Sequence, residues 1–153
     1  MTQQIENIKN VRKYLLNLIA DLNPEHLNEI PEGFNNNIIW NLAHLISTQQ
    51  GICYKRSGLQ PIVQDKFISP YLPGTKPEGF VDSSDVETIK SLLLSSLDEF
   101  ESDYKKNFFT TYTPVVTRYG VELANIDDAV NFLLFHEGLH TGYVMALKRV
   151  LKG

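Results

Sequence analysis

Four long segments of the chain carry apolar residues at helical spacing, and this periodicity most limits the possible fold. The segments span about residues 2–22, 36–57, 84–104 and 125–151. Within each segment, apolar residues recur three or four positions apart and therefore fall on one face of a helix. Four amphipathic helices that must bury these faces predict an all-α fold, a four-helix bundle.

Local signals set the expected ends of these helices. Pro24 should end the first helix, because proline cannot continue a helical hydrogen-bond ladder. Asn36 or Asn37 is a good N-cap for the second helix, and Gly58 is a typical C-terminal stop. The third helix is expected to begin at Ser84, with Glu87 completing a capping box.

Two connections between the helices are unusually long. Residues 58–82 contain four prolines and three glycines together with several apolar side chains. We expect this segment to pack on the bundle as an ordered lid or crossover, because structureless loops of this length are rare in compact domains. Residues 105–123 carry β-type residues around Pro114 and Gly120, which predicts an extended, packed connection with a short hairpin.

Length and composition favour one domain covering residues 1–153, in the cytoplasm. The net charge is −4, and the basic residues form no stripe, so nucleic-acid binding has no electrostatic support. Cys53 is the single cysteine, which excludes an internal disulfide and fits a reducing compartment. The polar N-terminal residues do not resemble a signal peptide, and no apolar run is long enough to cross a membrane.

Three of the four histidines fall inside these apolar helical segments. His136 and His140 are four residues apart, so they share one helix face with Cβ atoms roughly 5–6 Å apart. Burying two imidazoles costs free energy unless each finds a partner, and one metal ion would serve both. His44, from another helix, would complete a three-nitrogen site with an open coordination position, which is typical of catalytic metals.

The alternative is that these histidines are ordinary core residues. The face around His44 is more polar than its flanks, since it carries Asn41, Ser47 and Thr48 beside Trp40. These residues suit the wall of a site, but Trp40 could equally pack in the core while the polar residues face solvent. Side chains that would support the metal ligands are expected among Asn41, Thr48, Gln49, Glu137 and Tyr143. We assign no role to His26 or Cys53.

The segment from His136 to His140 also matches the HExxH pattern of zinc proteases, in which the glutamate is the general base. The extended form of that motif needs glycine and histidine where this chain has Tyr143 and Ala146. No Asp, Glu, His or Cys follows His140, so a downstream third ligand is missing. A protease is therefore disfavoured, and Glu137 is expected beside the metal face or exposed to solvent.

Two segments resemble a known family. Residues 37–45, with the following residues 48–59, are similar to the second helix of the DinB-like (DinB/YfiT) superfamily, and residues 135–143 are similar to its fourth helix. The resemblance covers essentially the whole chain. It implies an up-down-down-up bundle with long crossovers, and a divalent metal, zinc or nickel, held by His44, His136 and His140. Characterised relatives include thiol-dependent transferases and isomerases that use small thiol cofactors, and dimers are common.

The resulting hypothesis is an enzyme in which the metal holds a low-molecular-weight thiol as a thiolate that attacks a small electrophilic substrate. One alternative is a metal-dependent hydrolase that uses a metal-bound hydroxide. Another is a non-catalytic metal-binding or ligand-binding module of a stress response. The expected partners are a small-molecule substrate and a second copy of the chain, with neither nucleic acid nor membrane. Residues other than the three histidines receive no catalytic or cofactor-binding role.

Overall fold

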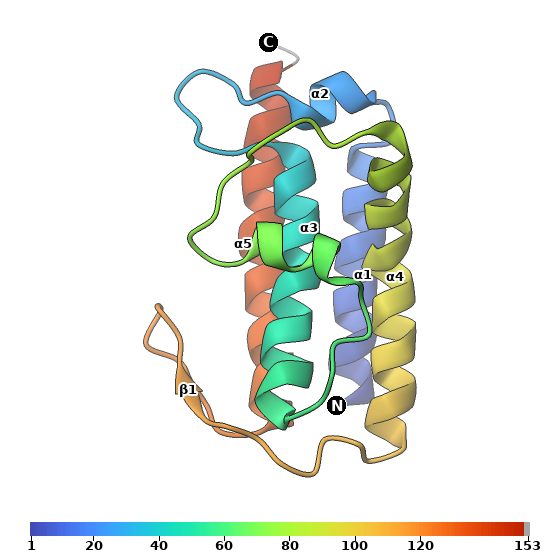
Figure 1. Cartoon of the computed structure of the whole chain (residues 1–153), viewed down its shortest axis with the longest axis vertical. Helices are drawn as coiled ribbons and strands as arrows, with labels where there is room; N and C mark the ends of the chain where they lie inside the picture. Colours follow the sequence, from blue (N-terminus) through green and yellow to red (C-terminus); the bar gives the residue numbers. More distant parts are fainter. Residues whose placement is uncertain (152–153) are drawn as a thin grey trace.

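The computed structural model describes residues 1–151 and is mostly helical (Figure 1), which confirms the all-α prediction. Its long helices are α1 (Thr2–Leu18), α3 (Ile38–Gln49), α4 (Ser83–Lys105) and α5 (Ile126–Leu151). They lie side by side, and the chain runs in one direction in α1 and α5 and in the opposite direction in α3 and α4 (Figure 1). None of the helices within residues 1–151 combines the length and apolarity needed to span a membrane.

The first connection contains a short helix after the point where Pro24 was expected to end the first one. The first helix stops at Leu18 rather than Leu22, and a short helix α2 (Pro24–Asn28) follows. The Asn23 side chain caps α2 by accepting a hydrogen bond from the His26 amide at 2.9 Å. Pro24 therefore starts a helix as well as ending one, because proline at the first helical position lacks only an N–H that would be unpaired there.

The second predicted helix is confirmed, but it is not regular throughout. Asn37 is its N-cap and accepts a hydrogen bond from the Trp40 amide at 2.9 Å. After α3 the chain continues as one π-helical turn, η1 (Gln50–Tyr54), and one 3-10 turn, η2 (Lys55–Ser57). Gly58 then ends the run with φ +73°, a left-handed conformation that favours glycine.

The predicted capping box at the start of the third long helix is wrong. Helix α4 begins at Ser83, and its N-cap is Asp82, whose side chain accepts a hydrogen bond from the Asp85 amide at 2.9 Å. Aspartate caps a helix as well as serine does, and here it stands two residues earlier. Ser84 therefore lies inside the first turn, where it cannot act as the cap.

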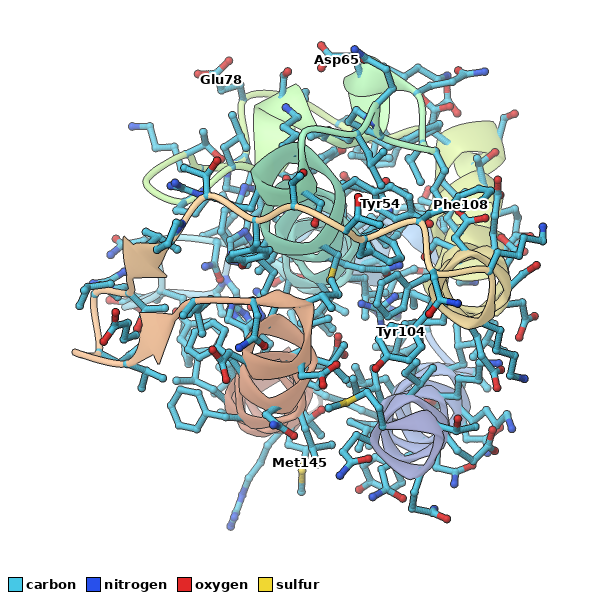
Figure 2. The ribbon with its side chains drawn as sticks, turned by 90° about the horizontal axis from the view of Figure 1, so that it is seen from below. Tyr54, Asp65, Glu78, Tyr104, Phe108 and Met145 are labelled. Atoms are coloured by element: carbon cyan, nitrogen blue, oxygen red, sulfur yellow. The ribbon has the colours of Figure 1, made fainter. Side chains whose placement is uncertain are left out.

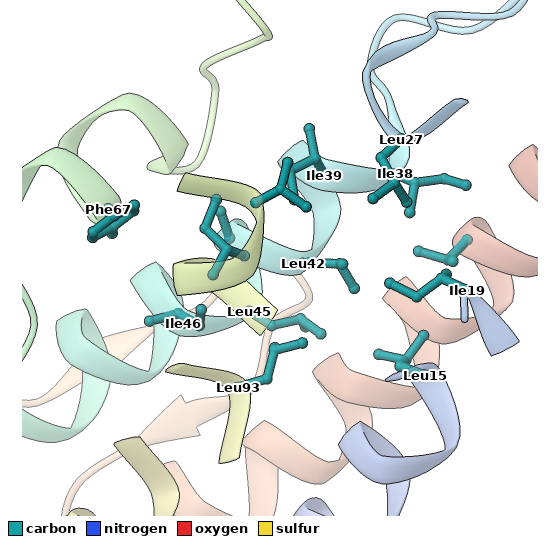
Figure 3. Packing of buried hydrophobic residues seen from close by; sticks show 14 of the residues in the cluster. Leu15, Ile19, Leu27, Ile38, Ile39, Leu42, Leu45, Ile46, Phe67 and Leu93 are labelled. Carbon is teal, nitrogen blue, oxygen red and sulfur yellow. The ribbon is translucent and has the colours of Figure 1, made fainter. Parts of the chain in front are cut away.

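The helices enclose a continuous interior made of two groups of buried apolar residues. One group joins α1, α2, α3 and α4, and Figure 3 shows Leu15, Ile19, Leu27, Leu42 and Leu93 meeting between these helices. The second group, toward the other end, includes Ile5, Cys53, Tyr54, Phe100 and Leu133. Figure 2 shows the four long helices end-on around this interior, with the labelled Tyr104 among them and Met145 at the outside.

Both long connections are ordered and packed. Residues 58–82 form two 3-10 turns, η3 (Asp65–Phe67) and η4 (Ser69–Tyr71), and bury Phe67 and Ile68 against the helices. The expected crossover packing is thus confirmed. The later connection forms an antiparallel hairpin of β1 (Val115–Val116) and β2 (Glu122–Leu123), also as expected, which lies beside α5 (Figure 1).

Candidate metal centre

Helices α3 and α5 bring the three histidines together. Nitrogen atoms of His44, His136 and His140 all lie within 4.8 Å of one another. The ring centroids are 5.1 Å apart for His44 and His136, 4.7 Å for His44 and His140, and 4.5 Å for His136 and His140. His44 and His136 are each 5% exposed, and His140 is partly buried. The grouping expected from the spacing is therefore present.

Hydrogen bonds fix the orientation of two of the imidazoles. His44 Nδ1 lies 2.6 Å from the carbonyl oxygen of Tyr71, which can only accept, so Nδ1 carries the proton. His140 Nδ1 likewise lies 2.8 Å from Asn41 Oδ1. The Asn41 amide is held in this orientation because its Nδ2 donates to the carbonyl of Asn37 at 2.8 Å. Both Nε2 atoms are therefore unprotonated, with a lone pair that can ligate a metal.

The third imidazole contains an unsatisfied buried atom. His136 Nδ1 is fully buried and has no hydrogen-bond partner among the described residues. An unpaired buried polar atom costs about 1–3 kcal/mol. A divalent metal bound at this nitrogen would supply the partner that it lacks. The donor set and this unpaired ring nitrogen both fit such an ion.

The electrostatics keep the rings neutral. Burial, together with the neighbouring His140, His44 and Arg12, lowers the pKa of His136 to about 2. Burial and the nearby His44 lower the pKa of His140 to about 3. Burial also lowers the pKa of His44, while the Tyr71 carbonyl opposes this change. Neutral imidazole is the form that binds metals, so all three rings are ready for ligation near pH 7.

The polar residues around His44 are buried, so they do not face solvent. Asn41 and Thr48 line the cavity beside the histidines, as predicted, whereas Ser47 does not. Trp40 stacks on His44 with 4.6 Å between ring centroids and 11° between ring planes. Thr48 Oγ1 lies 3.4 Å from His44 Nε2. Ser47 donates to the carbonyl of Ile68 at 2.9 Å, which attaches the crossover to α3.

Two residues expected near the metal have another role. Glu137 is fully buried and faces the interior, where its Oε1 accepts hydrogen bonds from Arg12 Nη2 at 2.7 Å and Nε at 3.0 Å. Gln49 Oε1 accepts from Arg12 Nη1 at 2.9 Å. Glu137 is therefore neither exposed nor beside the metal face, and Gln49 does not support a ligand. The glutamate of the HExxH pattern is committed to a core ion pair, which removes the base that a protease needs.

The three imidazoles line a cavity of about 480 Å³ between α3, α5 and the hairpin. Its walls are largely aromatic and aliphatic, and one edge is formed by residues of the 58–82 crossover. Tyr143, which we expected near the metal, lines this cavity and packs edge-on against Phe34, with ring centroids 5.7 Å apart. The other lining residues include Trp40, Ile52, Arg56, Arg118, Tyr119 and Phe132.

Two functional contacts were missed from the sequence. The Tyr71 carbonyl is a backbone group in a proline-rich segment, and no sequence signal marks it as the partner of His44. Arg12 is 0% exposed, although arginine on a surface helix is ordinarily solvated. Its position within the apolar stripe of α1, four residues after Ile8 and three before Leu15, was the available signal. Cys53 is buried, and burial raises the pKa of its thiol, so it remains without a role.

Comparison with known proteins agrees with the site. The family model of the DinB superfamily matches residues 7–144, which include all three histidines, the whole of α3 and most of α5. A search among curated proteins found no match. Because the match covers most of the described chain, the earlier resemblance is confirmed: this chain belongs to the DinB superfamily.

Proposed function

We propose that the protein is a divalent-metal-dependent transferase or isomerase that uses a small thiol and acts on a small electrophilic substrate. The observation that carries this proposal is the convergence of three neutral imidazoles on the wall of a cavity of about 480 Å³. Pockets for small organic ligands commonly have volumes of roughly 300–1,000 Å³. We also infer that α1, α3, α4 and α5 form the up-down-down-up bundle of the superfamily.

His44, His136 and His140 would hold the metal, and zinc or nickel is the expected ion. When bound, the metal would make a thiol or a water in the cavity far more acidic and therefore more nucleophilic at neutral pH. The chain itself contributes orientation: Tyr71 and Asn41 hold two imidazoles by their Nδ1 protons. Trp40 covers the face of His44 and shields it from water.

The metal claim is tested by elemental mass spectrometry of tag-free protein, with His44→Ala and His140→Ala as loss variants. His26→Ala is the matched control, because His26 is exposed on α2 and has no part in the site. We expect about one zinc or nickel ion per chain in the wild type and in the control, and large losses in both site variants. Absence of metal after reloading with zinc, nickel, manganese and iron would refute the proposal.

The reaction is tested separately with metal-loaded protein, several low-molecular-weight thiols and a generic electrophile. We expect thiol consumption that depends on the metal and disappears in His44→Ala. Product formation without any thiol would instead support a metal-dependent hydrolase. Bound metal with no turnover of any thiol or hydrolysable ester would support a non-catalytic binding module.

A further inference from the structure

The cavity beside the three histidines has a charge opposite to that of the whole molecule. The protein has 18 acidic and 14 basic residues. Yet, among residues 1–151, the cavity is lined by two arginines, Arg56 and Arg118, and by no aspartate or glutamate. The net negative charge of the protein repels anions at long range, so the two arginines can attract an anion only when it is already close to the cavity. This contrast is the starting point of the inference.

The two arginines come from different walls of the cavity. Arg56 belongs to the run Trp40, His44, Thr48, Ile52 and Arg56, which repeats every four residues along α3, η1 and η2, and every member lines the cavity. Twelve residues of helix correspond to about 18 Å along the axis, so Arg56 stands near the end of the groove away from the metal. Arg118 lies in the hairpin turn, just before Gly120 with its φ of +76°.

The side chains of both arginines are available to bind a ligand. Among residues 1–151, neither Arg56 nor Arg118 forms an ion pair, and the side chain of neither donates a hydrogen bond. Arg12 differs, because its guanidinium is fully engaged by Glu137, Gln49 and backbone carbonyls. Arg118 lies over the ring of Tyr119, with 5.8 Å from Cζ to the ring centroid, which orients it without neutralising it.

The wall between the arginines and the imidazoles is apolar. It is formed by Ile52, Leu123 and Phe132, and Phe132 is in turn packed between Tyr119 and His136, with ring centroids 6.2 Å and 6.0 Å away. This aromatic chain connects the hairpin to α5 and to a histidine of the site. A ligand that filled the cavity would therefore meet apolar side chains along its body and one guanidinium group from each of two walls, that of η2 and that of the hairpin.

We propose that the ligand of this cavity is a small organic anion with an apolar body, whose negative charge is stabilised by Arg56 and Arg118 while another part of it lies at the three histidines. The inference rests on the proposed function, since both use the same cavity, and it names the chemical class of the substrate. Guanidinium groups suit carboxylates because their planar donor fork can bind both oxygens. The aromatic and aliphatic walls provide the remaining contact area.

The test measures binding to metal-free protein by calorimetry, so that it does not depend on turnover or on a metal. The probes are phenylacetate, hydrocinnamate and phenylbutyrate, each compared with its neutral amide at pH 7.5. The fluorescence of Trp40, the single tryptophan and a cavity residue, reports whether binding occurs at this site. We expect at least one carboxylate to bind at least tenfold more tightly than its amide and to change the Trp40 emission.

The variants Arg56→Gln and Arg118→Gln should each weaken carboxylate binding by about tenfold, the effect of losing one hydrogen bond to a charged group. Binding of the amides should hardly change. Arg149→Gln is the matched control, because Arg149 is an exposed arginine of α5 outside the cavity. These variants replace solvent-accessible side chains, so the fold should be retained, which circular dichroism can verify.

The proposal is overturned if no carboxylate binds, if acids and amides bind equally, or if the control lowers affinity as much as the two cavity variants do. Failure of the proposed function would look different. A chain without bound metal, or without thiol chemistry, would still discriminate acids from amides through the two arginines. Conversely, a metal-dependent enzyme with no preference for anions would keep the proposed function and refute this inference.

Discussion

At the scale of single residues, Asn41 controls the geometry of the candidate metal centre, because it orients the imidazole of His140. Its Oδ1 accepts the Nδ1 proton of His140 from across the α3–α5 interface, and its Nδ2 is held by Asn36 and by the Asn37 carbonyl. The amide is thereby locked in the orientation that leaves His140 Nε2 free. Residues that hold a ligand in this way are nearly as important as the ligand itself.

Replacing Asn41 should therefore weaken metal binding while the fold survives. We expect Asn41→Ala to lower the affinity for zinc by about 10- to 100-fold, because His140 loses the partner that fixes its tautomer and ring orientation. Competition with a fluorescent chelator measures this directly. Asn10→Ala, on the exposed face of α1, is the control and should match the wild type. Unchanged affinity in Asn41→Ala would show that His140 is oriented by other contacts.

A second residue-scale feature is the buried pair of Arg12 and Glu137, both 0% exposed. Burial raises the pKa of Glu137, and the Arg12 guanidinium acts in the opposite direction. A buried ion pair contributes little net stability over apolar residues of similar size, but removal of one partner leaves an uncompensated charge. Glu137 follows His136 on α5, so its ion pair with Arg12 of α1 also fixes how α5 is rotated about its axis.

We expect Glu137→Gln to reduce the free energy of unfolding by about 3–5 kcal/mol. Urea denaturation provides the measurement, and Glu122→Gln on the exposed strand β2 should change it by no more than about 0.5 kcal/mol. The double variant Arg12→Met/Glu137→Leu should lose less than the sum of its two single changes. The folded fraction of Glu137→Gln should still bind metal, since Glu137 is not part of the imidazole cluster. Loss of metal at full stability would restore the protease-like role of this glutamate.

At the scale of secondary-structure elements, hydrogen bonds near the helix ends fix the path of the connections. The crossover between η2 and α4 is closed by Asn28, whose side chain donates to the Val81 carbonyl and accepts from the Val81 amide at 2.9 and 2.7 Å. These bonds bring the chain back to the start of α4. Asp82, the next residue, then caps the helix. The crossover can thus present the Tyr71 carbonyl to His44 because both of its ends are fixed.

The cap of α4 gives an element-scale prediction. Asp82→Ala should reduce the free energy of unfolding by about 1 kcal/mol, because the Asp85 amide loses its acceptor. Ser84→Ala, the residue that the sequence pattern favoured as the cap, should change it by no more than about 0.5 kcal/mol. Chemical denaturation of the two variants side by side separates them. A larger loss for Ser84→Ala would mean that Ser84 is the cap and that the helix begins two residues later than it does here.

At the scale of the whole molecule, burying three imidazoles makes stability depend on pH. Burial lowers the pKa of His140 to about 3, whereas an unfolded histidine titrates near 6.5. As the pH falls below 6.5, the unfolded chain takes up the proton first, so protonation favours unfolding. The stability that comes from this neutral ring is complete above about pH 6.5 and is lost progressively as the pH falls toward 3.

Metal-free protein should therefore lose stability between pH 6.5 and pH 4.5 more steeply than its His140→Gln variant. One titrating group accounts for a slope of at most about 1.4 kcal/mol per pH unit. Urea denaturation at several pH values measures both slopes. The exposed histidine provides the control, and His26→Gln should retain the wild-type slope. Equal slopes in wild type and His140→Gln would mean that His140 is solvated in the native state.

Two whole-molecule expectations from the sequence stay predictions. These are a homodimer and a cytoplasmic location. The described helices include exposed apolar side chains such as Phe135, Leu139 and Met145 on α5, which are compatible with an interface or with cavity access. A small-molecule substrate, with neither nucleic-acid nor membrane partners, also stays a prediction, and the binding experiments above test its first part.

The sequence by itself determined the helices and the histidine grouping. Apolar spacing of three and four residues is a local property, so it located the long helices, and Asn37 and Gly58 marked the ends of one of them. The spacing of His136 and His140 similarly fixed their common face, and their cost of burial pointed to a shared partner. The segments around His44 and His136 carried enough information to identify the superfamily.

Only the tertiary structure decided what surrounds those histidines. The Tyr71 carbonyl reaches His44 from 27 residues away, and Arg12 meets Glu137 across 125 residues. Arg56 and Arg118 likewise line the same cavity only because the hairpin lies beside α5. Contacts of this kind depend on how the helices turn about their axes and how the crossovers pack. Local periodicity cannot specify them, because a buried face does not reveal which distant side chain will complete its hydrogen bonds.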